Sequence, residues 1–197
     1  MAKKIYAVDS KLGSSFLGAL SGPMALLGAY GRSVFGGTVV SVASVADMVA
    51  KVRAAAGGDK IYNLMIFGHG SPACQSVGCG TAGDVTGDYS LRLDAVGGDL
   101  IGAGKALLPT LAPLFTKDAI VLLGGCNVGG KDYSPTFMTT TDGQDLLKAV
   151  SKALGGIYTE ASDFYQLGPS TCTLGKTIRC NSTACYVSSR LTSLDRW

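Results

Sequence analysis

The chain has 197 residues, which is long enough for one domain with a substantial hydrophobic core. Hydrophobic residues make up 47% of the sequence and charged residues 16%, a composition that excludes a disordered protein. The formal net charge is only +3 and the sequence has no run of lysine or arginine, so it lacks the basic patch typical of nucleic-acid-binding proteins.

The N-terminal part of the chain shows neither a cleavable signal nor a membrane anchor. Its start, MAKKIYAVDS, places Asp9 ahead of the apolar stretch 17–30, without the charged, apolar and small-residue order of a signal peptide. Pro23 and several glycines interrupt that stretch, which is also too short to span a bilayer. We therefore expect no cleaved signal and no membrane contact, and the compartment stays open between the cytoplasm and a non-classical export route.

Hydrophobic patterns in the first part of the chain predict a parallel sheet. Residues 3–9 and 38–42 are apolar or β-branched, which is typical of strands. Residues 45–56 repeat apolar side chains at helical spacing and follow Ser44, a favourable helix cap. Residues 61–67 form a near-continuous apolar run, as expected for a strand buried on both faces. The order strand, helix, strand favours parallel pairing.

The middle of the chain alternates polar segments with shorter elements. Residues 71–96 are polar and rich in glycine, which indicates a long loop or a small hairpin. Residues 100–108 have helical spacing until two prolines interrupt it. Residues 119–124 are a second buried-strand run. We expect the threonine-rich segment 131–141 to be an irregular, exposed and mobile loop.

The last part of the chain completes a single predicted domain. Asp142 is positioned to cap a helix over residues 143–154, and a short strand follows at 157–159. The tail from residue 168 holds three cysteines and alternating side chains, which indicates a hairpin or a covering segment. No internal repeat or linker occurs, so we predict one α/β domain over residues 1–197, with the covering segment at about 168–197.

Six cysteines are many for a protein of a reducing compartment. Setting Cys126 aside leaves an odd number, so at most two disulfides can form among the remainder. Two pairs, Cys74/Cys79 and Cys180/Cys185, share the same C-x4-C spacing. They predict disulfides, buried thiols or one zinc site that both pairs share. The five cysteines are Cys74, Cys79, Cys172, Cys180 and Cys185.

Two of the predicted buried strands run into residues suited to nucleophilic catalysis. The strand at 61–67 leads to Gly68-His69-Gly70, and the strand at 119–124 leads to Gly125-Cys126. His69 is the only histidine in the chain. A cysteine or a histidine alone is more often structural, but two neighbouring strands would bring this pair to the edge where open α/β sheets place their chemistry.

Such a pair predicts thiol chemistry assisted by an imidazole. His69 would deprotonate the Cys126 thiol, because the thiolate is the attacking species. The backbone amides of Gly70 and Cys126 would point at the oxyanion that forms on the attacked carbonyl group. The neighbouring glycines would let a substrate backbone come close.

The order strand-His69-Gly70, helix, strand-Gly125-Cys126 resembles the caspase-like peptidases, a group that includes caspases, gingipains, clostripain and toxin self-processing domains. The two site residues lie 57 positions apart, near the roughly 50 typical of caspases. The segments GGCNVGG, DGQDLLKAVSKALGG and IYTEAS make the sequence most similar to bacterial caspase-like domains, over residues 38–162. The cysteine lacks the Gln-Ala-Cys-x-Gly context of caspases proper, which leaves the specificity open.

This resemblance implies a three-layer αβα sandwich with a mainly parallel central sheet. It implies a cysteine endopeptidase, a hydrolase of peptide or protein substrates that uses the His69/Cys126 dyad without a metal or cofactor. In the resembled families a linker after the cysteine is often cut, and Lys131, Asp132 and Asp142 offer positions for self-processing here. The alternative is a catalytically inactive caspase-like binding or structural domain.

Two further interpretations concern a phosphate site and the specificity pocket. Gly125 to Lys131 has the glycine and lysine spacing of a P-loop, but Asp132 stands where that loop needs Ser or Thr, and Pro135 opposes the helix that should follow. The sequence does not single out the walls of a substrate pocket. The candidates for a pocket that binds a basic residue are Asp84, Asp88, Asp94, Asp163 and Glu160. The candidates for a pocket that binds an acidic residue are Arg92 and Arg190.

Overall fold

The computed structural model describes residues 2–11, 36–78, 84–94, 98–134, 139–163 and 176–188. Its centre is a seven-stranded sheet in the order β12-β11-β10-β7-β3-β1-β2. Neighbouring strands from β2 to β10 pair in parallel, and β11 and β12 add antiparallel pairs at one edge. The strands are Lys3–Asp9 (β1), Thr38–Val42 (β2), Ile61–Phe67 (β3), Phe115–Leu123 (β7), Tyr158–Ser162 (β10), Thr177–Cys180 (β11) and Cys185–Ser188 (β12).

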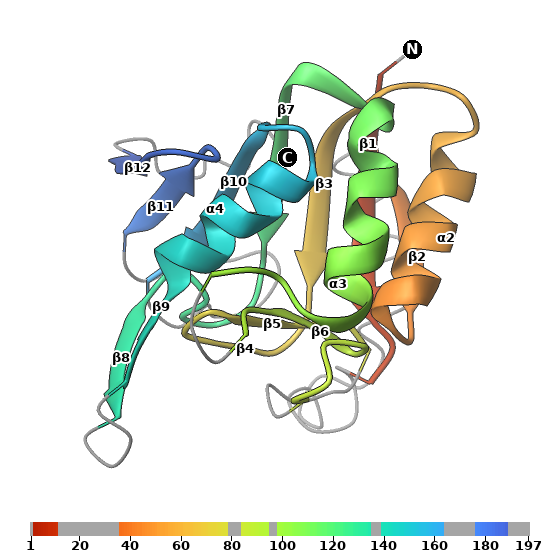
Figure 1. Ribbon diagram of the computed structural model, residues 1–197. Coiled ribbons are helices and arrows are strands. Elements are labelled where there is room, and N and C mark those ends of the chain that lie inside the picture. The colour runs from red at the N-terminus through yellow and green to blue at the C-terminus, as the bar shows by residue number, and fades with distance from the viewer. Residues whose placement is uncertain are drawn as a thin grey trace.

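The described helices lie over one face of this sheet (Figure 1). They are α2 (Val45–Ala56), α3 (Gly102–Leu107) and α4 (Gly143–Ala153), and apolar side chains of all three pack into or against one hydrophobic core with the sheet. The α/β class and the mostly parallel sheet are therefore confirmed. The described residues place no second layer of helices on the opposite face, and none of their helices is long and apolar enough to cross a membrane.

The central strands are buried on both faces, as their apolar runs predict. Leu64 and Leu123 point into the main core, whereas Phe67 and Leu122 belong to two smaller buried clusters. Because β3 and β7 lie in the middle of the sheet, each is paired on both sides. A parallel strand in that position requires a nearly continuous hydrophobic sequence.

The helix α2 begins and ends where its caps require. The Ser44 side chain accepts a hydrogen bond from the Asp47 amide at 3.0 Å, and Asp47 Oδ2 accepts one from the Ala43 amide at 2.9 Å. Gly57 adopts φ 58°, a left-handed conformation that suits glycine at a helix end. The predicted bounds of 45–56 are confirmed.

The segment after α3 departs from a simple helix because of its prolines. The 3₁₀ helix η1 (Leu108–Leu114) follows α3 directly and contains Pro109 and Pro113. A short 3₁₀ turn tolerates the missing amides better than a longer α-helix does. The chain then enters β7 at Phe115, earlier than the predicted start at residue 119.

A small antiparallel sheet covers the carboxyl-terminal ends of the central strands. It consists of β4 (Gly70–Ser71), β5 (Cys74–Ser76) and β6 (Ser90–Arg92). Figure 1 shows it at the end of the sheet toward which β3 points. Of the two expectations for residues 71–96, a long loop or a small hairpin, the second agrees with the pairing of β4 with β5, and β6 extends this pair.

Residues 131–134 and 139–142 form two paired strands, so the prediction of an irregular loop over 131–141 is wrong for them. The strands β8 (Lys131–Ser134) and β9 (Thr139–Asp142) pair antiparallel over their whole lengths. The threonines that suggested a loop are β-branched residues that favour strands. Figure 1 shows this hairpin extending away from the body of the protein. An ion pair between Lys131 Nζ and Asp142 Oδ2, 2.7 Å long, closes its base.

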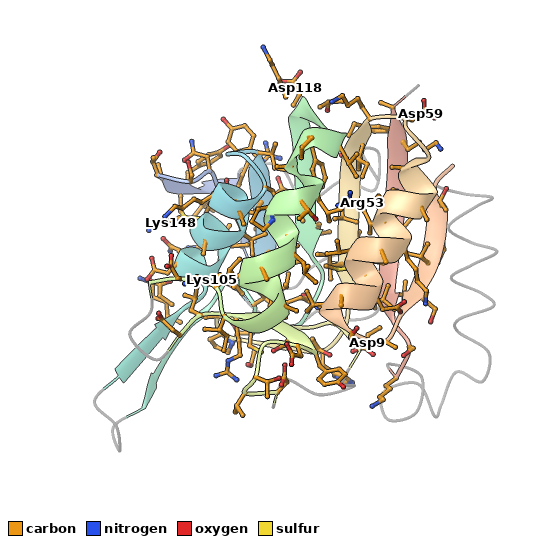
Figure 2. The ribbon with its side chains drawn as sticks, turned by 45° about the vertical axis from the view of Figure 1, so that its right-hand side comes forward. Asp9, Arg53, Asp59, Lys105, Asp118 and Lys148 are labelled. Atoms are coloured by element: carbon orange, nitrogen blue, oxygen red, sulfur yellow. A yellow bond between two sulfur atoms is a disulfide. The ribbon has the colours of Figure 1, made fainter. Side chains whose placement is uncertain are left out.

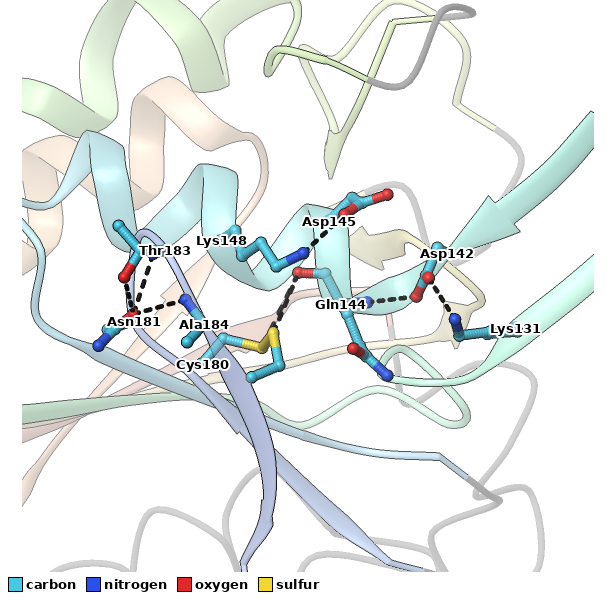
Figure 3. A network of polar contacts seen from close by, with 10 residues as sticks. Lys131, Asp142, Gln144, Asp145, Lys148, Cys180, Asn181, Thr183 and Ala184 are labelled. Atoms are coloured by element: carbon cyan, nitrogen blue, oxygen red, sulfur yellow. Dashed lines mark hydrogen bonds and ion pairs between the residues drawn. A yellow bond between two sulfur atoms is a disulfide. The ribbon is translucent and has the colours of Figure 1, made fainter.

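The C-terminal hairpin extends the sheet and is closed by a disulfide. Cys180 and Cys185 are paired in register across β11 and β12 and form a disulfide bond. Both sulfur atoms lie against the first turn of α4, 3.8 and 3.7 Å from the Gln144 carbonyl oxygen (Figure 3). The Asn181 side chain orders the connecting turn by accepting hydrogen bonds from Thr183 and Ala184. The apolar stretch at residues 17–30 lies outside the described residues.

Candidate active site

Parallel pairing between β3 and β7 places His69 and Cys126 at the same edge of the sheet. Ile66 is paired with Leu123, and the Gly124 amide donates to the Ile66 carbonyl group at 2.8 Å. His69 and Cys126 follow this pair after the same number of residues, so the two chain segments leave the sheet side by side. The prediction that the two strands are neighbours is confirmed.

The two segments touch through glycine backbones. A Cβ atom on Gly70 would lie 2.7 Å from both the Gly125 carbonyl carbon and the Cys126 carbonyl oxygen. A Cβ atom on Gly125 would lie 2.8 Å from the Gly70 Cα atom. These distances are shorter than nonbonded atoms tolerate, so only glycine lets the two segments pack so closely.

The two candidate site residues are less buried than residues of the hydrophobic core. His69 and Cys126 are both partly exposed, whereas Gly125 and Val128 beside them are buried. Cys126 is present as a thiol. A histidine and a cysteine that are partly exposed thus lie next to a buried backbone framework.

The direction of the Gly70 amide follows from the pairing of β4 with β5. The Ser76 amide donates to the His69 carbonyl group at 2.8 Å, and the next pair along the hairpin is Gly70 with Gln75. Because hydrogen-bonded and non-hydrogen-bonded pairs alternate in antiparallel strands, the Gly70–Gln75 pair is of the second kind. The Gly70 N–H group consequently points away from β5.

The turn after Cys126 is anchored on both sides. Asn127 adopts φ 56°, and its carbonyl group accepts a hydrogen bond from the Gly130 amide at 3.0 Å. The Gly129 amide donates to Ser162 at the end of β10, and the Ala73 amide donates to Val128. The chain then enters the strand β8. A P-loop would need a helix at that point, so the structure does not support the phosphate-binding alternative.

Two buried polar residues at this edge were not predicted as part of the site. Gln75 is fully buried, and its side-chain amide lies between the Gly125 amide and the Ser76 carbonyl group. Asp9, at the end of β1, is also fully buried and accepts a hydrogen bond from the Ser76 hydroxyl group. Figure 2 shows Asp9 at the end of the sheet opposite Asp59 and Asp118.

Neither residue carries a local sequence signal. Gln75 sits in a glycine-rich segment, and its contact with Gly125 spans 50 positions of sequence. Asp9 is the last residue of a strand, a position where an aspartate is common for many reasons. Only the pairing of distant strands reveals that both residues approach the site.

Most of the acidic pocket candidates have structural roles. Glu160 pairs with Arg179 across β10 and β11, and Asp163 accepts a hydrogen bond from the Lys176 amide at 2.6 Å. Asp94 and Asp88 accept hydrogen bonds from the amides of Gly98 and Ala103. The Arg92 guanidinium donates to the Asp84 carbonyl group, and Arg190 lies outside the described residues.

Asp84 organises the loop that leads into β6. Its carboxylate accepts hydrogen bonds from Thr86, Gly87, Tyr89 and Ser90. Burial on its own would raise the pKa of Asp84, but the hydrogen bonds from Thr86, Tyr89 and Ser90 outweigh it and lower the pKa to about 2. The charged Asp84 carboxylate thus stabilises this loop through its hydrogen bonds.

The disulfide also changes the interpretation of the cysteine pairs. Because Cys180 and Cys185 are joined, they cannot supply thiolates to a zinc site shared with Cys74 and Cys79. Within the described ranges, no group of three His, Cys, Asp or Glu side chains is arranged to hold a metal ion. Cys79 and Cys172 lie outside those ranges.

Comparison with protein-family models, with curated proteins and with solved structures found no match to this chain.

We predict that Asp84→Asn lowers the free energy of unfolding at neutral pH and that the loss disappears in acid. The pKa of Asp84 is lower in the folded than in the unfolded chain, so its contribution is complete above about pH 4 and is lost as the pH falls towards about 2. Urea unfolding of both proteins across this range measures the difference. A constant difference at every pH would contradict the role of the charged carboxylate.

We further predict that Gly70→Ala destabilises the protein by about 1–3 kcal/mol, because the new methyl group overlaps Gly125 and Cys126. The matched control is Gly104→Ala in α3, where the nearest atom, Leu91 Cδ2, is 3.4 Å from the new Cβ atom. Alanine favours a helix, so this control should unfold no more easily than the wild type. Equal urea stability of the two variants would argue against the close contact of the two segments.

Proposed function

We propose that this protein is a cysteine peptidase that uses His69 and Cys126 as its catalytic dyad. The observation that carries this proposal is the paired exit of the two residues from adjacent parallel strands, with their backbones in contact at Gly70 and Gly125. This is the edge of an α/β sheet where ligands are expected to bind. The partial exposure of both side chains supports the same conclusion.

The proposed reaction begins with proton transfer from the Cys126 thiol to the His69 imidazole. The thiolate attacks the carbonyl carbon of the scissile peptide bond, and the negative charge moves to the carbonyl oxygen. The His69 imidazolium then protonates the departing amine, and an acyl-enzyme remains on Cys126. Water activated by His69 hydrolyses this thioester and restores the thiol.

The amides of Gly70 and Cys126 are the proposed oxyanion donors. Backbone amides suit this task because they are fixed before the charge develops. The Gly70 N–H group is directed away from β5, which is consistent with such a role. The close packing of Gly70 against Cys126 keeps the two donors near one another.

The alternative is a caspase-like domain that binds a partner without catalysis. A scaffold of this kind would have no need for a partly exposed cysteine at the same sheet edge as the only histidine of the chain. The alternative remains distinguishable by reactivity, because a thiol without a base reacts as an ordinary cysteine does.

We expect iodoacetamide to alkylate Cys126 faster than a free cysteine at neutral pH, and His69→Ala to remove this excess rate. Mass spectrometry of the peptide that contains Cys126 measures the rate. Buried Cys74 serves as an internal comparison. A wild-type rate equal to that of free cysteine would favour the non-catalytic domain. Cleavage of an unfolded protein by wild type, but not by Cys126→Ala, would then establish peptidase activity.

Self-processing within residues 131–142 is part of this proposal. The pairing of β8 with β9 determines what must happen before such a cut. Peptidases bind an extended, unpaired chain, whereas Lys131 and Asp132 are paired with Asp142 and Thr141. Cleavage at these positions therefore requires β8 and β9 to separate first.

We predict that a cut at Lys131 or Asp132 is slow in the wild type, absent in Cys126→Ala and faster in Asp142→Asn. The last variant weakens the ion pair with Lys131, which closes the base of the hairpin. Intact-mass measurement during a long incubation follows the cut. A chain that stays whole in all three proteins while the wild type cleaves an unfolded protein would exclude self-processing at this place.

A further inference from the structure

Gln75 occupies the space between the ends of the two strands that carry the candidate dyad. It is the middle residue of β5, it is paired with Gly70, and it is fully buried. A Cβ atom on Gly125 would lie 2.9 Å from Gln75 Oε1, and one on Gly68 would lie 3.1 Å from Gln75 Nε2. The side-chain amide therefore packs against the backbone on both the His69 side and the Cys126 side.

Both ends of this amide are hydrogen-bonded. Oε1 accepts from the Gly125 N–H group at 2.8 Å, and Nε2 donates to the Ser76 carbonyl oxygen at 2.9 Å. One partner is a donor and the other an acceptor, so only one orientation of the amide satisfies both. A buried glutamine in this position is held rigidly.

These bonds form a continuous chain from one site residue to the other. The His69 carbonyl group accepts from the Ser76 amide at 2.8 Å, and the Ser76 carbonyl group accepts from Gln75. Gln75 in turn accepts from Gly125, whose carbonyl group belongs to the peptide bond that supplies the Cys126 amide. This series of hydrogen bonds connects the end of β3 to the end of β7 next to the candidate site.

We propose that Gln75 is a positioning residue that sets the distance between His69 and Cys126 and aims the Cys126 amide. This inference rests on the proposed function, because a positioning role requires that the two residues act together. Gln75 does not take part in the chemistry itself. Its effect on the site is transmitted through the Gly125 peptide and through Ser76.

The variant Gln75→Glu allows a test that depends on protonation. The introduced carboxylate can accept the Gly125 N–H group but repels the Ser76 carbonyl oxygen, and its charge disfavours a thiolate nearby. When protonated, the carboxyl group again has one donor and one acceptor and reproduces the glutamine. Burial favours the protonated form, so this recovery should occur at mildly acidic pH.

The experiment compares alkylation of Cys126 by iodoacetamide in the wild type, Gln75→Glu, Gln75→Met and His69→Ala from about pH 5 to about pH 9. Circular dichroism gives the folded fraction of each protein, and the rates are corrected for it. Gln144→Glu is the matched control, since it adds the same charge on a partly exposed residue at the start of α4. The double variant Gln75→Met/His69→Ala completes a mutant cycle.

We expect the rate of Gln75→Glu to approach that of the wild type in acid and to fall at least about tenfold below it at alkaline pH, the size typical of a misplaced catalytic group. Gln75→Met should be slow at every pH, and Gln144→Glu should follow the wild type. The double variant should be no slower than His69→Ala, because a disrupted dyad cannot be disrupted twice.

Three different outcomes would overturn the inference. If His69→Ala is slow but both Gln75 variants react within about twofold of the wild type, the dyad stands and Gln75 does not position it. If His69→Ala reacts at the wild-type rate, no dyad exists and the proposed function fails together with this inference. Additive losses in the double variant would also overturn it, since they would assign Gln75 a general structural effect.

Discussion

The close packing of Gly70 against Gly125 is the constraint on which the rest of this site depends. Two strand ends can meet at such short distances only when neither residue carries a side chain. This contact brings the backbone on either side of it, including His69 and Cys126, to one place. The Gln75 amide packs beside Gly125 and accepts a hydrogen bond from its N–H group.

Around this contact, hydrogen bonds from three directions hold the segment that follows Cys126. The β4–β5 hairpin contributes the Ala73 amide, the end of β10 contributes the Ser162 carbonyl group, and the first residue of α4 contributes the Gly143 amide. A segment fixed by so many separate elements has little freedom to rearrange. Such rigidity is what a preorganised site requires, because donors fixed in advance need not reorganise during a reaction.

Local patterns were enough to predict the central part of the fold. The apolar runs of β3 and β7 identified strands buried on both faces, and Ser44 with Asp47 identified the start of α2. The placement of His69 and Cys126 at one edge followed from parallel pairing alone. The β8–β9 hairpin escaped prediction because threonine occurs both in loops and in strands, and only the partner strand distinguishes the two.

Long-range polar contacts were beyond the reach of local patterns. An aspartate that orders its own loop, such as Asp84, has the same sequence appearance as one that binds a substrate. Glu160 is similar, since its partner Arg179 comes from a later strand. Gln75 is the clearest case, because its contact with Gly125 joins residues that only the assembled sheet brings together.

The β8–β9 hairpin joins the body of the protein without a flexible connection at its C-terminal side. Asp142 is both the last residue of β9 and the cap of α4, where its side chain accepts from the Gln144 amide at 2.9 Å (Figure 3). Gly143 packs against the Val128 carbonyl group, and its amide binds Gly130, so the same joint also touches the turn after Cys126. The described base of the hairpin is therefore joined both to the helix cap and to the turn that follows Cys126. A displacement of this base would shift the helix cap and that turn together.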